Sequence, residues 1–358
     1  MRAAVCRAFG QPLTIEEVTL DPPGPSQVAV DLAACAICHS DISYAEGAWG
    51  GELPAVYGHE ATGRVTAVGP GVRDLAPGDR VLVTLIRACG TCPACAGGDP
   101  TSCDHAWDVP PSPLRDATGA PLVQGMKTAA FAEAVVVDRS QVVRLHDDLP
   151  FEQACLLACG VITGVGAVVN SARVPPGADV AVIGAGGVGL NAIQGAAIAG
   201  AARIIALDVA EARLAAARPF GATHGVLAGP EAAARVRAIT GRAGVDFAFV
   251  AVGSPGAMAD AASLLAAGGK LVVVGMPASG VTVPYEPVTL ASMNQAIIGS
   301  RMGRTVLARD IPWLIEHWRA GRLKLAELIS GRYPLEGINA AIAEVKAGTA
   351  RRNVILFQ

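Results

Sequence analysis

Charge is scarce in this sequence. Charged residues make up 16% of its 358 residues, the formal net charge is −3, and no long run carries a single sign. A nucleic-acid-binding protein usually presents a basic face, so we expect no nucleic-acid partner. The first ten residues, MRAAVCRAFG, also lack the apolar core of a signal peptide, which predicts a cytoplasmic rather than a secreted protein.

Long hydrophobic runs are also rare. The longest stretch without charge, residues 180–202, has the length of a bilayer span. It contains Asn191 and Gln194, and its glycines break it in the manner of a strand, a turn and a helix. We therefore expect no membrane association. Hydrophobic residues still make up 52% of the chain, which is ample for sizeable cores, and the length suggests two domains.

Cysteine is present in an odd number. The nine cysteines cannot all pair in disulfides, and a chain of this length does not need such bonds to fold. Metal or redox chemistry in a reducing compartment is therefore the better interpretation of the cysteines.

The first part of the chain is typical of a β-rich domain. Runs rich in β-branched and apolar residues are separated by clusters of proline and glycine, which predicts short strands joined by turns in an antiparallel, barrel-like domain. The runs are residues 28–37, 63–69, 79–86 and 131–137.

The pattern changes near residue 150. Residues 151–170 have helical apolar spacing, and predicted strands then alternate with predicted helices. This alternation predicts a doubly wound parallel sheet in an α/β domain. The strands are residues 180–185, 203–209, 245–253 and 270–276, and the helices are residues 191–200, 211–221 and 257–269. Two further helices, residues 311–321 and 337–348, and a strand at residues 353–357 end the chain.

A dinucleotide-binding pattern lies in the alternating part. Gly184-x-Gly186-x-x-Gly189 follows a β-branched strand and opens a helix, where the first glycine permits a tight turn, the second admits a pyrophosphate and the third allows close packing. Asp208 ends the next strand, where its carboxylate would bind ribose hydroxyls and repel a 2′-phosphate, which favours NAD over NADP. Arg213 could flank the adenosine ribose or be a solvated helix charge. The glycines could also form a turn that only packs.

Four cysteines are clustered on one loop. Cys89, Cys92, Cys95 and Cys103 lie among glycine and proline residues, as in a closed tetrahedral zinc site with a structural role. An iron–sulfur cluster also takes four thiolates, but its bacterial spacing places a proline after the last cysteine, where this chain has Asp104.

A second metal site would have to be assembled from separate segments. A catalytic zinc keeps three protein ligands and one open position, and the candidates are Cys38, His59 and Cys159. Each has another interpretation. Cys35 and Cys38 have the spacing of a redox dithiol, His59 could be an ordinary buried or surface residue, and Cys159 could be a small buried hydrophobe.

The motifs together resemble one family. CHSD at residues 38–41, GHE at 58–60, the four-cysteine loop, LLACGVITGVGA at 156–167 and VAVIGAGGVG at 180–189 occur in the order seen in medium-chain zinc-dependent alcohol dehydrogenases. The resemblance covers essentially the whole chain, and residues 155–208 look closest to the class III, glutathione-dependent formaldehyde dehydrogenase branch.

The resemblance implies a fold with a divided first domain. A GroES-like, partly open β-barrel catalytic domain would comprise residues 1–160 and 301–358. A Rossmann NAD-binding domain would comprise residues 161–300, and the active site would lie in the cleft between the two domains. The resemblance also implies a homodimer, with a tetramer as the alternative.

The resemblance also assigns roles to individual residues. Cys38, His59 and Cys159 would hold the catalytic zinc, which Glu60 could approach, and Asp41 would orient the ligand histidine. Ser40 would bind the substrate hydroxyl and pass its proton outward, while the alcohol carbon gives a hydride to NAD. The remaining expected cofactor contacts are His39, Thr163, Gly187, Val188, Val252 and Arg352. Trp49, Leu85 and Met276 are expected walls of an apolar substrate pocket.

The chain departs from the family at three places. Ser43 stands where many members have a histidine that ends the proton relay, so water or His39 would have to finish it. Trp107 stands where the glutathione-dependent branch has an arginine for the substrate carboxylate, and residues 43–57 lack that branch's acidic pattern. Glutathione adducts are therefore disfavoured as substrates. The substrate, its stereochemistry and the direction of the reaction are left open, as are the roles of Cys6, Cys35 and Cys155.

Other functions remain as alternatives to an alcohol dehydrogenase. A dehydrogenase for polyols or for thiol–formaldehyde adducts would share the same motifs. A non-enzymatic zinc–dinucleotide sensor would bind metal without hydride transfer, but it would not need the three catalytic ligands together with Ser40. A zinc-free quinone reductase of the same superfamily is disfavoured by both cysteine sets.

Overall fold

The computed structural model describes residues 1–145 and 148–357 and divides into two compact units. Unit 1 comprises Met1–Cys159, Val306–Trp318 and Leu325–Gln358, and unit 2 comprises Gly160–Thr305 and Arg319–Lys324. The boundary expected at residue 300 thus lies at 305. The expected return of the chain to the first domain is interrupted by Arg319–Lys324.

Unit 1 is built from two sheets. One has five strands in the order β7-β2-β1-β4-β8, and the other has seven, in the order β10-β6-β5-β3-β18-β17 with β9 also paired to β3. Among the described residues of this unit most neighbouring strands are antiparallel, and the β4–β8 and β17–β18 pairs are parallel. The strands are β1 Arg2–Cys6, β2 Thr14–Leu20, β3 Gln27–Ala36, β4 Ala55–Val56, β5 Glu60–Val68, β6 Arg80–Thr84, β7 Leu114–Asp116, β8 Val123–Gln124, β9 Ala134–Asp138, β10 Val142–Arg144, β17 Ile329–Tyr333 and β18 Arg352–Leu356.

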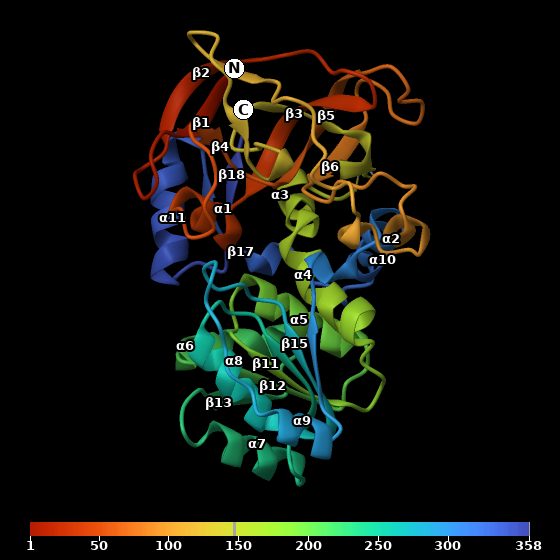
Figure 1. The fold of residues 1–358 in the computed structure, drawn as a ribbon, viewed down its shortest axis with the longest axis vertical. Helices are drawn as coiled ribbons and strands as arrows, with labels where there is room; N and C mark the ends of the chain where they lie inside the picture. The colour runs from red at the N-terminus through yellow and green to blue at the C-terminus, as the bar shows by residue number, and fades with distance from the viewer. Residues whose placement is uncertain (146–147, 358) are drawn as a thin grey trace. The chain divides into compact units, whose positions relative to one another are not determined.

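Burial along β3 explains its central place in unit 1. Its first half alternates between buried and more exposed residues, and its last three residues are all buried. Those three residues pair antiparallel with the C-terminal strand β18, so the end of the chain becomes part of the sheet that carries residues 28–37 (Figure 1). The helices of unit 1 are α1 His39–Ala45, α2 Pro93–Ala96, α3 Phe151–Ala154, α10 Leu307–Arg319 and α11 Ile338–Ala347.

Unit 2 contains a six-stranded parallel sheet in the order β13-β12-β11-β14-β15-β16. Its central strand β11 is buried at every residue, as the near-continuous apolar run of a parallel sheet covered on both faces requires. The strands are β11 Asp179–Ile183, β12 Arg203–Asp208, β13 His224–Leu227, β14 Val245–Val250, β15 Leu265–Val273 and β16 Ala296–Gly299. The helices are α4 Gly160–Gly166, α5 Gly187–Ile198, α6 Glu211–Ala217, α7 Ala232–Thr240, α8 Pro255–Ala261 and α9 Pro287–Ser292.

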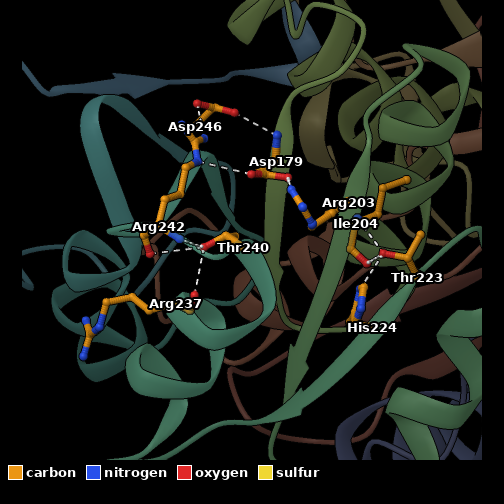
Figure 2. Close-up of polar contacts among 9 residues, drawn as sticks. All are labelled: Asp179, Arg203, Ile204, Thr223, His224, Arg237, Thr240, Arg242 and Asp246. Atoms are coloured by element: carbon orange, nitrogen blue, oxygen red, sulfur yellow. Dashed lines mark hydrogen bonds and ion pairs between the residues drawn. The ribbon is translucent and has the colours of Figure 1, made fainter.

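A buried carboxylate joins the amino ends of three of these strands. Asp179, at the start of β11, accepts hydrogen bonds from Arg203 Nη1 at 2.9 Å and from Arg242 Nε at 3.3 Å (Figure 2). Its own N–H donates to Asp246 Oδ2 at 2.8 Å, and Arg242 also bonds to Asp246. A buried charge must be paired, and this network pairs it while fixing the edge of the sheet opposite the carboxyl ends.

The structure confirms the predicted fold class and refines several elements. Residues 180–202 form β11, the glycine turn and α5, as expected from their glycines. The helical pattern of residues 151–170 is instead broken into α3, a 3₁₀ turn at Cys155–Ala158, α4 and a π-helix at Ala167–Ala172. Among the described residues no single helix has the length and apolar character needed to cross a membrane. Phe151–Ala158 with Gly160–Ala172 is one bent pair that meets both criteria, by length and composition only.

Candidate active site and metal centres

The short helix α1 begins at a candidate metal ligand. Cys38 is its N-cap, and Asp41, in its first turn, accepts a hydrogen bond from the Cys38 N–H at 2.9 Å through Oδ2. The other carboxylate oxygen, Oδ1, accepts from the Gly58 N–H and from His59 Nδ1, both at 2.9 Å. The buried Asp41 carboxylate thus joins the segments that carry Cys38 and His59.

This contact decides which nitrogen of His59 can bind a metal. Because Nδ1 donates its proton to Asp41, the lone pair is on Nε2. His59 Nε2 is buried and has no hydrogen-bond partner among the described residues. Burying a polar atom without a hydrogen-bond partner costs free energy. The position of this nitrogen therefore indicates that it binds a metal.

Three further candidate ligand atoms lie close to a ring nitrogen of His59. The ligand atoms of Cys38, His59, Glu60 and Cys159 all lie within 4.8 Å of one another, and all four residues are buried. A hydrogen bond from Cys159 and the nearby His59 hold the pKa of the Cys38 thiol well below its usual range. The thiolate is the metal-binding form of cysteine, and two thiolates with one imidazole are a zinc donor set. The donor set therefore fits the catalytic zinc expected from the sequence.

Glu60 in this group is paired with a residue from the C-terminal strand. Arg352 on β18 is buried and lies 2.5 Å from Glu60 Oε2 through its Nη2. Burial raises the pKa of Glu60 to about 7, even though Arg352 opposes the shift. Nothing local in the sequence signals this ion pair, because the two residues are almost three hundred positions apart. The expected contact of Arg352 with cofactor phosphates stays a prediction.

The four-cysteine loop forms a second candidate centre. The sulfur atoms of Cys89, Cys92, Cys95 and Cys103 lie within 4.8 Å of one another. The N–H groups of Thr91 and Cys92 donate to Cys89 Sγ at 3.4 and 3.3 Å and lower the pKa of that thiol to about 6. Among the described residues, the buried apolar cluster of this loop consists of Cys92, Cys103 and Ala106, with the partly buried Ala88, Ala94 and Cys95 packed against it. A zinc held by four thiolates would supply the stability that so small a core cannot.

The glycine turn of unit 2 has the geometry of a phosphate site. Gly184 has a φ of +93°, and a Cβ on Gly189 would lie 1.7 Å from the Gly184 carbonyl oxygen. A Cβ on Gly186 would instead meet no atom within 4 Å, so this backbone faces open space at the start of α5. The N–H groups of a helix N-terminus bind phosphate. This arrangement fits the pyrophosphate of a dinucleotide.

The expected ribose-binding acid lies at the same edge of the sheet. Asp208 ends β12, and its Oδ2 accepts from the Ala185 N–H of the glycine turn at 2.8 Å. Its Oδ1 accepts from the Ala210 N–H at 3.2 Å and lies 3.6 Å from Arg213 Nη1. The carboxylate therefore holds the turn in place, and each oxygen has a further lone pair that can accept a hydrogen bond from a ribose hydroxyl. Val252 touches the same turn, since a Cβ on Gly184 would lie 2.3 Å from its Cγ1.

The remaining expected site residues are divided between the two units. Ser40 is half-buried in the first turn of α1, after the exposed His39. In the same unit, Trp49 packs edge-on against Tyr44 with ring centroids 5.1 Å apart, and Leu85 follows β6. In unit 2, Thr163 Oγ1 lies 3.7 Å from Met302 Sδ, and Met276 is 59% exposed. The roles of these residues toward substrate and cofactor stay predictions.

Cys6, Cys35 and Cys155, which had no assigned role, are buried.

Comparisons with known proteins match almost the whole chain. Residues 24–147 match a family model described as an alcohol dehydrogenase GroES-like domain, and residues 187–318 match one described as a zinc-binding dehydrogenase. The chain is 34% identical to an NDMA-dependent alcohol dehydrogenase of Amycolatopsis methanolica over 99% of this chain and 98% of that one. It is 33% identical to an alcohol dehydrogenase class-3 of Cereibacter sphaeroides over 99% of both.

A solved structure shows the same fold over the whole chain. The crystal structure of an alcohol dehydrogenase zinc-binding domain protein from Burkholderia ambifaria has a TM-score of 0.95 and 35% identity, and the match covers 100% of this chain and 98% of that one. Two family models and relatives matched over almost their whole length identify the family of this chain. The chain belongs to the medium-chain, zinc-dependent alcohol dehydrogenase family of oxidoreductases.

Proposed function

We propose that the protein oxidises an alcohol, or reduces the corresponding aldehyde or ketone, by hydride transfer with NAD. The observation that carries this proposal is the buried Nε2 of His59, without a hydrogen-bond partner among the described residues and beside two cysteine thiols. Zinc bound there would act as a Lewis acid that lowers the pKa of a hydroxyl group. A structural zinc site is closed by four protein ligands. Three protein ligands leave a fourth position open for the substrate, as in a catalytic site.

The residues around this centre have separate tasks in the proposal. Asp41 holds Cys38 and His59 in place through its three hydrogen bonds. Ser40, two residues after Cys38, accepts the proton of the substrate hydroxyl and passes it outward, where water or the exposed His39 takes it up. The buried ion pair of Glu60 with Arg352 keeps a carboxylate beside the ligands without leaving its charge uncompensated.

The cofactor preference is proposed from unit 2. The glycine turn would hold the pyrophosphate, and Asp208 would accept the ribose hydroxyls and repel a 2′-phosphate, so NAD is favoured over NADP. Thr163, which is also in unit 2, would contribute to the cofactor site. One relative is described as NDMA-dependent, so the assay needs a condition that contains NDMA in addition to NAD.

The test is a panel of apolar alcohols, polyols and a thiol–formaldehyde adduct, and their aldehydes or ketones where these exist. Zinc-quantified protein is assayed with NAD or NADP, with and without NDMA. We expect NAD-linked turnover of at least one apolar alcohol, and no turnover in His59→Ala or Cys38→Ser although NAD still binds. Protein with two zinc ions per chain that transfers no hydride under any condition would contradict the proposal and favour a non-enzymatic sensor.

We also propose that the protein is a homodimer. Six exposed large apolar side chains lie within 22 residues of unit 2: Met276, Val281, Tyr285, Val288, Met293 and Ile297. The last of them is on β16, which is an edge strand of the sheet. A concentration of exposed apolar residues is typical of a protein interface. We expect a dimer in light scattering and a monomer after Val288→Asp with Ile297→Lys, whereas Val109→Asp, at an exposed apolar residue of unit 1, should leave the dimer intact.

A further inference from the structure

A strained turn is bonded to the segment that carries His59. We call the site of Cys38, His59 and Cys159 the mononuclear centre, to distinguish it from the four-cysteine centre. Met126, Lys127 and Ala129 have φ values of +48°, +63° and +58°, the left-handed region that only glycine adopts without cost. Three such residues within four positions persist only where surrounding contacts hold them. We call residues 126–129 the left-handed turn.

One end of the left-handed turn is bonded to the segment that carries His59. Directly after the turn, the Ala130 N–H donates to the Gly58 carbonyl at 2.9 Å and the Phe131 N–H donates to the Tyr57 carbonyl at 2.8 Å. Gly58 is the residue before His59, and a Cβ there would lie 2.5 Å from the Phe131 nitrogen. The position of the turn therefore affects the position of His59.

The middle of the turn is linked to the other candidate ligands. The buried Gln141 donates through Nε2 to the Lys127 carbonyl at 3.1 Å and to the Thr84 carbonyl at 2.9 Å. Thr84 is the cross-strand partner of Glu60, and its hydroxyl donates to the Ala158 carbonyl at 2.6 Å, directly before Cys159. The Lys127 backbone thus supports the strand pair that carries Glu60 and the turn that carries Cys159.

The Lys127 side chain is placed to hold this turn. It is only 6% exposed, and its ammonium lies 3.8 Å from the centroid of the Trp107 ring, which is itself 62% exposed. A cation over an indole face is attracted more strongly when it is withdrawn from water. Trp107 follows Cys103 on the four-cysteine loop, and that loop is tied down by Arg87 Nη1, which donates to the His105 carbonyl at 3.0 Å.

We propose that Lys127 is a positioning residue for the mononuclear metal centre, because its contact with Trp107 holds the left-handed turn on which the His59 segment and the Gln141–Thr84 link depend. The contact also connects the two metal centres, since Trp107 belongs to the four-cysteine loop. This inference rests on the zinc centre of the proposed function. Its test measures metal binding rather than turnover.

The test uses three substitutions of Lys127 that separate its charge from its backbone. Lys127→Met keeps the length of the side chain and the strain but loses the cation, Lys127→Arg keeps the cation, and Lys127→Gly loses the side chain but relieves the strain at φ +63°. Zinc release from the holoenzyme to a chromophoric chelator is followed at each centre. Cobalt(II) replacing zinc reports the ligand geometry of the mononuclear centre through its visible absorption.

We expect Lys127→Met to release the mononuclear zinc about tenfold faster and to shift the cobalt spectrum. This factor corresponds to the cost of one left-handed residue that has lost its side-chain contact. Trp107→Leu should do the same, whereas Lys127→Arg and Lys127→Gly should stay close to the wild type. If Lys127→Met behaves as the wild type, or if Lys127→Gly is impaired as much as Lys127→Met, the inference is wrong. A wild-type chain that holds no mononuclear zinc would instead refute the proposed function.

Discussion

The Asp41 carboxylate offers the sharpest test of the mononuclear centre. Three donors share its two oxygens: the Cys38 N–H on Oδ2, and the Gly58 N–H and His59 Nδ1 on Oδ1. In Asp41→Asn the side-chain oxygen can still accept from Gly58 and His59, but the new amide group faces the Cys38 N–H, donor against donor. Asp41→Ala removes all three bonds.

The size of the effect follows from these contacts. A buried donor left without an acceptor costs about 1–3 kcal/mol, and residues that orient a metal-bound histidine typically change metal affinity about 10- to 100-fold. We therefore expect Asp41→Asn to weaken zinc binding at the mononuclear centre by about 10- to 100-fold, or about 1.4–2.8 kcal/mol. Asp41→Ala should weaken it further.

The assay is competition for zinc against a chelator of known affinity. The four-cysteine centre in the same molecule serves as an internal reference, because Asp41 makes no hydrogen bond to that loop among the described residues. Asp179→Asn is the matched control: it also removes a buried carboxylate with several partners, but in unit 2 (Figure 2). Zinc affinity in Asp41→Asn within about twofold of the wild type would refute this account, because it would mean that the imidazole needs no carboxylate to orient it.

Two further predictions concern the other sites. Cys103→Ser should lower the zinc content from two ions to one per chain, measured by metal analysis. It should also reduce Tm by several degrees in calorimetry, because the small core of this loop cannot replace the metal. An unchanged Tm would contradict a structural role. Asp208→Asn should raise the ratio of kcat/KM with NADP to kcat/KM with NAD by about tenfold, because the substitution removes the repulsion of a 2′-phosphate. The asparagine keeps an acceptor for the Ala185 N–H. An unchanged ratio would show that Asp208 does not select the cofactor.

Local patterns account for most of the secondary structure that the sequence predicts. The runs at residues 28–37, 63–69, 79–86 and 131–137 all contain strands, because their period and composition are local properties. Short strands were missed, among them β4, β13 and β16, since strands of two to four residues carry too few positions for a pattern. The break of residues 151–170 into several helical pieces was missed for a different reason. Their apolar spacing fits any helix, and the close contacts that break it are tertiary.

The sequence by itself determined what depends on neighbours along the chain: the four-cysteine spacing, the glycine turn before α5 and the acid that ends β12. Only the tertiary structure decided the partners that come from distant segments. It placed Arg352 beside Glu60, gave Asp41 three donors from two segments, and set Lys127 under Trp107. The physical reason is that hydrogen bonds, ion pairs and metal coordination act over a few ångströms. Which residues come that close is determined by the packing of the sheets rather than by their order in the chain.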